Sequence, residues 1–257
     1  MTLTAILFFS SPVIIMEQKN LSDHVWHPTL NTSWQVQFTG KINQSVDAVM
    51  YDVDLFDNNA SIIDSLHMNG HKVVCYISAG TWENWRPDRA KAPDSIKGKS
   101  VIGWYGERWL DIRQISILAP IMDARMDLCK QKGFDGIEPD NMDVYQQDTG
   151  FPVTYQDQIN YNKFLANEAH ARGLSIGLKN DLGQINDLLP YFDWAVNEEC
   201  FVYEECSALL QFIKANKAVF QIEYDLDKRH LCFQANAMNF NSIRKHRNLD
   251  AWLDPCR

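Results

Sequence analysis

The stretch ILAPIMDARMDLCKQKGFDGIEPD, residues 117–140, carries the pattern that decides the fold. Apolar residues recur with helical spacing over Ile117–Lys132, and after Gly133 the segment Phe134–Asp140 has the length and character of a buried strand. Glycine readily adopts the left-handed conformation that closes a helix. The stretch therefore predicts a helix, a tight turn and a strand in succession.

The same succession occurs three more times along the chain. A helical segment runs into Gly70 before His71–Ser78, Tyr155–Arg172 ends at Gly173 before Leu174–Asn180, and Ala208–Ala215 ends at Asn216 before Ala218–Tyr224. The remaining predicted strands are Trp34–Phe38, Ala48–Asp54, Phe192–Glu198 and Asn239–Lys245. Continuous apolar strands that alternate with helices are typical of parallel sheets covered on both faces.

Eight such strands predict an α/β protein with a single (β/α)8 TIM barrel, which we place over residues 30–257. The alternative is a doubly wound open sheet. Neither the glycine-rich GxGxxG phosphate loop nor a P-loop is present, so nucleotide cofactors find no support. We expect no cofactor and no metal ion.

Length and charge narrow the classes of partner. The 257 residues are 46% hydrophobic and 22% charged, which is typical of a globular protein. Because 33 acidic residues outnumber 24 lysines and arginines, the net charge is -9. An acidic surface repels nucleic acid and favours a cationic partner. We expect a monomer.

The N-terminal segment Leu3–Met16 is apolar but interrupted by Ser10, Ser11 and Pro12. It is shorter than the roughly 20 apolar residues that span a bilayer, so we expect no transmembrane span. We interpret residues 1–20 as a signal peptide, with an apolar N-terminal segment as the alternative, and expect secretion, although a basic start and a clear cleavage site are missing.

The six cysteines form no CxxC pair, so the sequence does not support a zinc site or a thioredoxin-like motif. Cys75 and Cys129 lie within apolar patterns and are expected to be buried small hydrophobes. In an exported chain, Cys200 with Cys206 and Cys232 with Cys256 are plausible disulfides.

Functional side chains of a barrel lie at the carboxyl ends of its strands. The candidates there are Asp52, Asp54, Tyr76, Ser78, Glu138, Asp140, Asn141, Lys179, Asn180, Asp181, Glu198, Glu199 and Glu223. The loop after the third strand adds Trp82, Trp85, Arg86, Trp104 and Trp109. Buried carboxylates are costly unless they are paired, and acids beneath an aromatic rim suit a sugar ring. These tryptophans could equally belong to the core.

Glycoside hydrolysis needs two carboxyl groups, and we favour Asp140 and Glu198. A turn role for Asp140 and an ordinary ion pair for Glu198 stay open, and the adjacent Glu199 leaves the choice of acid ambiguous. We interpret Glu138 as a supporting acid; the alternative is that Glu138 and Asp135 face the core or pair with Arg125.

Three other chemistries have less support in the sequence. Lys179 at a strand end could form a Schiff base, or it could pair with the surrounding acids. The histidine pairs His24 with His27 and His67 with His71 stand apart from the acids, which argues against a metal site. Ser78 lacks both a GxSxG elbow and a nearby histidine.

Eight segments, in order, resemble glycoside hydrolase family 114, the endo-α-1,4-polygalactosaminidase family. They are YDVDLFD (51–57), VVCYISAGTWENWRPD (73–88), GWYGERWLDIR (103–113), GFDGIEPDNMD (133–143), TGFPVTYQDQINYN (149–162), GLSIGLKND (173–181), VNEECFVYEEC (196–206) and FQIEY (220–224). The resemblance implies a TIM barrel, Asp140 and Glu198 as the catalytic pair, and a Cys200–Cys206 pair.

The substrate that this resemblance implies is a partly deacetylated α-1,4-linked galactosamine polymer, a polycation suited to an acidic cleft. By analogy with the α-galactosidase clan, Asp140 would be the nucleophile and Glu198 the acid/base, with retention of configuration. The alternative function is a catalytically silent barrel that binds amino-sugar polymers.

Overall fold

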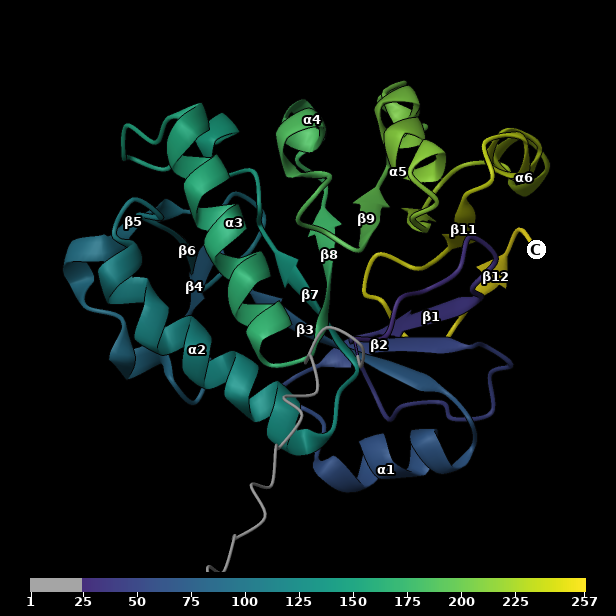
Figure 1. Cartoon of the computed structure of the whole chain (residues 1–257), viewed down its shortest axis with the longest axis horizontal. Helices are drawn as coiled ribbons and strands as arrows, with labels where there is room; N and C mark the ends of the chain where they lie inside the picture. Colours follow the sequence, from purple (N-terminus) through teal and green to yellow (C-terminus); the bar gives the residue numbers. More distant parts are fainter. Residues whose placement is uncertain (1–24) are drawn as a thin grey trace, which may run out of the picture.

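The computed structural model describes residues 25–257, which form an α/β barrel of eight parallel strands (Figure 1). The strands are β1 (Trp34–Gln37), β2 (Met50–Asp54), β3 (Lys72–Ser78), β7 (Gly136–Asp140), β8 (Ser175–Lys179), β9 (Trp194–Glu198), β10 (Val219–Glu223) and β11 (Asn241–Arg244). They pair in chain order. The predicted TIM barrel and its eight strands are confirmed, whereas the predicted signal peptide lies outside the described residues.

The barrel is closed at the seam between β1 and β11 by the C-terminal segment. The short strand β12 (Asp254–Pro255) pairs antiparallel with β11. The backbone N–H groups of Phe38 and Thr39 donate to the carbonyl of Leu249 at 2.9 and 3.2 Å. The buried Lys245 donates to Gln35 Oε1 at 2.9 Å across the seam. Side chains therefore join the two end strands where the backbone ladder stops.

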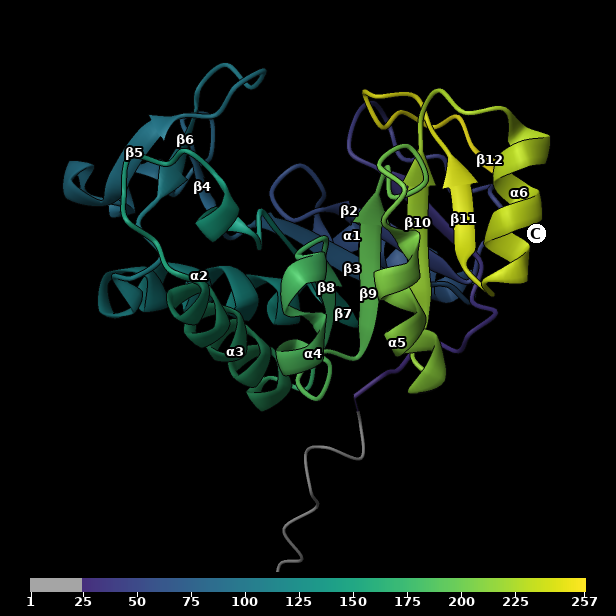
Figure 2. The ribbon, with the colours of Figure 1, turned by 90° about the horizontal axis from the view of Figure 1, so that it is seen from above.

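Helices cover the outside of the barrel (Figures 1 and 2). The α-helices are α1 (Ala60–Met68), α2 (Ile115–Lys132), α3 (Tyr155–Ala171), α4 (Ile185–Leu188), α5 (Leu210–Lys214) and α6 (Lys228–Ala237). Short 3-10 helices occupy Arg89–Lys91, Asp94–Ile96, Val144–Gln146, Leu182–Gln184 and Cys206–Leu209. Gly133 closes α2 with φ of 92°, and Asn216 follows α5 with φ of 57°. The residues at two of the predicted turns therefore take the expected left-handed conformation.

A second, three-stranded sheet is inserted after β3, where only an aromatic loop was expected. It consists of β4 (Thr81–Glu83), β6 (Glu107–Leu110) and β5 (Lys97–Ser100), paired antiparallel in the order β4-β6-β5. In both views the sheet lies to one side of the barrel (Figure 2). Glu83 faces Glu107 across the ladder, while Trp82 faces Arg108. Successive side chains alternate between faces, so the acids and Trp82 lie on opposite faces.

The barrel interior has an apolar floor beneath a charged layer. Trp34, Val36, Trp194 and Phe220 belong to one buried cluster at the floor. The indole of Trp194 takes the space where a Cβ of Gly177 would stand, only 2.2 Å from a ring atom. Toward the carboxyl ends of the strands, the buried interior side chains become Asp52, Glu138 and Lys179.

Three disulfides connect the cysteines: Cys75–Cys129, Cys200–Cys206 and Cys232–Cys256. The second and third bonds confirm the predicted pairs. The prediction for Cys75 and Cys129 was wrong in part, because both are buried as expected but bonded to each other. Cys75 lies on β3 and Cys129 on α2, and their Cα atoms are 6.2 Å apart, within disulfide range. None of the helices in residues 25–257 combines the length and apolar character needed to cross a membrane.

Candidate active site

The side chain of Lys179, at the end of β8, lies at the centre of a cluster of carboxylates. Its Nζ is 2.9 Å from Glu138 Oε1, 3.0 Å from Asp140 Oδ1 and 2.9 Å from Glu198 Oε1. Lys179 and Glu138 are buried, with side-chain exposures of 4% and 2%, whereas Asp140 and Glu198 keep 23% and 27%. The two acids favoured from the sequence are therefore neighbours that remain accessible from solvent.

This arrangement keeps Lys179 protonated. Burial alone would lower its pKa, but the charges of Asp140, Glu138 and Glu198 outweigh burial and raise the pKa well above its ordinary value. Schiff-base formation needs a neutral amine, so the geometry favours the ion-pairing interpretation of Lys179 over the nucleophilic one.

Asp140 is held as a carboxylate by three donors. Tyr76 Oη donates to its Oδ2 at 2.9 Å, while the Asn141 backbone N–H and Lys179 Nζ donate to Oδ1 at 2.8 and 3.0 Å. Burial raises the pKa of Asp140, but Lys179 and the other donors more than compensate and lower it below its ordinary value. The backbone turns sharply at Asn141, which has φ of 60°.

Glu198, at the end of β9, is oriented from two sides. The hydroxyl of Tyr224 donates to Glu198 Oε2, and Lys179 contacts Oε1. The backbone N–H of Glu198 donates to Asn180 Oδ1 at 3.0 Å, so Asn180 supports this strand end from β8. Both oxygens of this carboxyl group are therefore engaged while part of its surface faces solvent.

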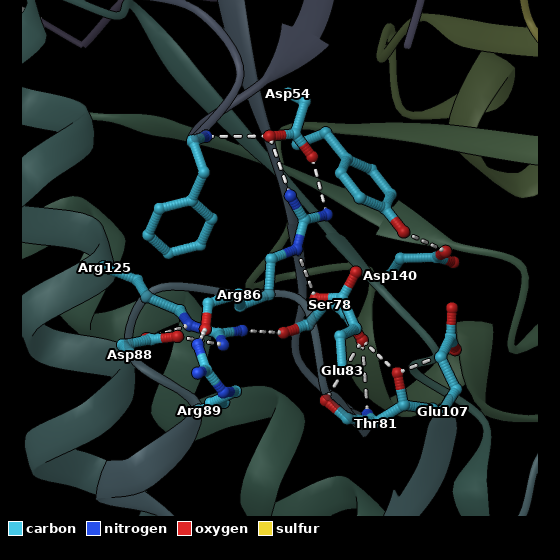
Figure 3. A network of polar contacts seen from close by, with 12 residues as sticks. Asp54, Ser78, Thr81, Glu83, Arg86, Asp88, Arg89, Glu107, Arg125 and Asp140 are labelled. Carbon is cyan, nitrogen blue, oxygen red and sulfur yellow. Dashed lines mark hydrogen bonds and ion pairs between the residues drawn. The ribbon is translucent and has the colours of Figure 1, made fainter. Parts of the chain in front are cut away.

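A second ionic network anchors the inserted sheet beside the barrel (Figure 3). Arg86 bonds Asp54 through NH2 at 2.6 Å and Glu83 through Nε at 2.8 Å, and all three residues are buried. Arg125 binds Asp88 at 2.8 Å instead of Glu138, so the predicted alternative pairing of Glu138 with Arg125 was wrong. Arg125 also reaches the carbonyl of Ser78 at 2.7 Å, which links α2 to this loop.

Glu107 on β6 is an acid that the strand-end analysis missed, because it belongs to the inserted sheet. Its Oε2 accepts from Thr81 Oγ1 at 3.2 Å, and Thr81 contacts Ser78, which in turn accepts from Asn141 Nδ2. In Figure 3 its carboxyl group lies near Asp140. Burial, and then the charges of Glu83 and Asp140, raise the pKa of Glu107 to about 7.

Three predicted residues lie outside the Lys179 cluster. Glu223 points out of the barrel and accepts from the Phe201 backbone N–H at 3.0 Å. Glu199 pairs with Arg247 at 2.9 Å. Asp181 accepts from Asn162 at 2.9 Å, and burial, then the charge of Asp143, raise its pKa to about 9. A position at a strand end predicts that an acid lies near the site, but it does not determine which way the side chain points.

The aromatic residues divide between surface and core. Trp82 and Trp104 line a cavity of about 560 Å³ together with Asn84, Tyr105 and Arg108. Trp85 and Trp104 are 48% and 61% exposed, whereas Trp109 is buried. The face of Trp82 is partly occupied by Lys97, whose Nζ lies 4.2 Å from the ring centre. In residues 25–257 no group of three His, Cys, Asp or Glu side chains is placed to hold a metal ion.

Comparison with known proteins gives a consistent result. The profile of the family described as "Glycoside-hydrolase family GH114" matches residues 16–257. Among solved structures, Aspergillus fumigatus Ega3 in complex with galactosamine is 41% identical, with a TM-score of 0.87 over 93% of this chain and 100% of Ega3. No match was found among curated proteins.

Two further structures share the fold at low identity. The glycoside hydrolase domain of PelA from Pseudomonas aeruginosa is 12% identical, with a TM-score of 0.67 over 85% of this chain and 96% of that domain. The α-galactosidase TtGalA from Thermus thermophilus is 11% identical, with a TM-score of 0.54 over 84% of this chain and 58% of that enzyme.

Replacing Lys179 tests whether it holds the cluster together. We expect Lys179→Met to lower the free energy of unfolding by about 3–5 kcal/mol at pH 8, because three carboxylates lose a buried cation. The loss should shrink at pH 5, where the acids can take up protons. Urea unfolding followed by circular dichroism measures both values.

The control is Lys217→Met, because within residues 25–257 Lys217 donates only to the carbonyls of Leu189 and Phe192. We expect it to cost about 1–3 kcal/mol with little pH dependence. A loss below about 1 kcal/mol for Lys179→Met at both pH values would contradict the central role of this lysine.

Proposed function

The chain belongs to glycoside hydrolase family GH114, and we propose that it is a secreted, endo-acting hydrolase of α-1,4-linked galactosamine polymers. The observation that carries the proposal is the contact of one buried ammonium group, Lys179 Nζ, with both Asp140 and Glu198. A pair of neighbouring carboxyl groups that both remain partly exposed is what glycosidic bond cleavage requires.

The spacing of these acids favours retention of anomeric configuration. The contacted oxygens of Asp140 and Glu198 lie 3.0 and 2.9 Å from the same nitrogen, so their separation cannot exceed the sum of these distances. Retaining enzymes hold their carboxyl groups about 5–5.5 Å apart, whereas inverting enzymes need about 6.5–9.5 Å to admit a water molecule. This limit applies to the one pair of oxygens that contacts Lys179, and it agrees with the shorter, retaining spacing.

Within a retaining mechanism, Asp140 is the nucleophile. Its low pKa keeps it ionised, and one of its oxygens attacks the anomeric carbon while Glu198 gives its proton to the leaving glycosidic oxygen. Glu198 then removes a proton from the water that cleaves the glycosyl ester on Asp140. Tyr76 and Lys179 hold Asp140 in place by donating to it throughout.

The proposed substrate follows from charge and from Ega3, which is 41% identical and was solved with galactosamine. The protein carries a net charge of -9, Asp140 and Glu198 contact the same ammonium group, and the Glu107 carboxyl group lies near Asp140. A polymer with protonated amines is complementary to such a cleft. The cavity lined by Trp82 and Trp104 offers indole surfaces for a more distant sugar ring.

Secretion is supported by the cysteines. All six are paired in three disulfides, and such bonds persist in oxidising compartments and are rare in the cytosol.

Substitution of the two acids tests the catalytic assignment. We expect Asp140→Asn and Glu198→Gln to leave the fold intact and to lower kcat on deacetylated polymer by a factor of about 100 or more, because each removes a group used in the transition state. Product release is measured by mass spectrometry.

Glu199→Gln is the matched control, since Glu199 follows Glu198 directly and pairs with Arg247 on the surface. It should retain most of the turnover. If Glu199→Gln is the more damaging of the two, the acid/base has been placed one residue off, and unchanged turnover in Asp140→Asn removes Asp140 from the mechanism.

Varying the ionic strength tests whether the site recognises the protonated amines of the polymer. Raising salt to physiological strength shortens the reach of exposed charges to about 8 Å, so kcat/KM on deacetylated polymer should fall while kcat changes little. Fully N-acetylated polymer lacks the amines and should be a poor substrate with little salt dependence. Equal rates for the two polymers would show that the amines are not recognised.

A further inference from the structure

Asp52, in the middle of β2, is a carboxylic acid without a visible partner for either oxygen. Its side chain is 0% exposed inside the barrel. Among the described residues, neither of its oxygens has a hydrogen-bond donor, and the same holds for Glu138 Oε2, which is equally buried. The other oxygen of Glu138 contacts Lys179. Three buried acid oxygens thus remain unsatisfied in the layer directly below the candidate catalytic pair.

We propose that Asp52 is a positioning residue that stays protonated at neutral pH and donates its proton to Glu138 Oε2. This donation holds Glu138 so that its Oε1 faces Lys179, and Lys179 in turn contacts Asp140 and Glu198. The roles of Asp140 and Glu198 in this inference rest on the proposed function. The protonation of Asp52 is independent of that function.

Charge balance favours the proton on Asp52. The charged groups around it are Glu138 and Asp140 on β7 and Lys179 on β8. Lys179 is the cation among them, and it already contacts three carboxylates. A second buried carboxylate beside Glu138 would be desolvated, repelled and without a donor, which costs several kcal/mol. One proton between the two acids replaces that repulsion with a hydrogen bond.

The choice between the two acids follows from their contacts. Glu138 touches the Lys179 ammonium, which stabilises its ionised form, whereas Asp52 makes no such contact. Burial, and then the charge of Glu138, raise the pKa of Asp52 well above its ordinary value. An ionised Asp52 would also compete for Lys179 and draw it away from Asp140 and Glu198. A neutral Asp52 therefore leaves Lys179 in contact with Asp140 and Glu198.

The test compares Asp52→Asn with the wild-type protein in urea unfolding at pH 5 and pH 8. The unfolded chain releases the Asp52 proton near pH 4, whereas the folded protein keeps it, so the contribution of Asp52 to wild-type stability falls as pH rises above 4. Asparagine has no proton to lose. The urea midpoint of Asp52→Asn, relative to wild type, should therefore shift upward from pH 5 to pH 8. Parallel pH profiles would overturn the proposal.

Asp54→Asn is the matched control, because Asp54 lies two residues further along β2 and is ion-paired with Arg86. Loss of an ion-paired carboxylate should lower the urea midpoint by a similar amount at both pH values. An upward shift as large as that of Asp52→Asn would show that the effect is not specific to Asp52.

Kinetics test the positioning role separately. Asparagine keeps a donor for Glu138, so kcat of Asp52→Asn on deacetylated polymer should stay within about threefold of wild type, while Asp52→Leu should lose about 30-fold or more. Equal loss in both variants contradicts positioning. If Asp52→Leu does not fold, the urea midpoints of Asp52→Asn decide the proposal. Absence of wild-type hydrolysis would instead refute the proposed function and leave the urea test valid.

Discussion

The ion pairs of Lys179 are the interaction on which the geometry of the site depends. Its ammonium group joins Glu138, Asp140 and Glu198, which come from two different strands, β7 and β9. A buried cation of this kind is stable only because carboxylates surround it, and the carboxylates are tolerated only because the cation is there. Lys179 itself lies on β8. The apolar cluster around Trp194 and the contact of Lys245 with Gln35 across the seam hold β7, β8 and β9 at a fixed spacing below the ion pairs.

The inserted sheet of β4, β6 and β5 packs beside the barrel, next to the candidate site. Arg86 ties the sheet to Asp54 at the end of β2, and Arg125 ties the loop to α2. These buried pairs place Glu107 near Asp140, and Glu107 also lines the cavity formed by Trp82 and Trp104. The inserted sheet therefore adds an acid near the proposed catalytic pair and exposed aromatic surface beside it, both of which support the proposed amino-sugar substrate.

Much of the barrel could be predicted because each helix, turn and strand is a local pattern, as in the stretch that ends at Asp140. The inserted sheet could not, because β4, β5 and β6 are three or four residues long and are stabilised by the distant pairs of Arg86. The Cys75–Cys129 bond was missed for the same reason, since 54 residues separate its partners. In the site, the strand-end rule brought Asp140, Lys179 and Glu198 together correctly. It could not separate them from Glu223, which faces outward, and it overlooked Glu107, which lies on no barrel strand.

The central claim is that Lys179 holds Asp140 and Glu198 at the spacing of a retaining enzyme. The most direct measurement is proton NMR of a deacetylated α-1,4-galactosamine oligosaccharide during the first minutes of hydrolysis, before the new reducing end mutarotates. Retention predicts that the α-anomer of the product appears first and then relaxes toward the equilibrium mixture. Initial formation of the β-anomer would contradict the account, because it requires a water molecule between two carboxyl groups that share one ammonium.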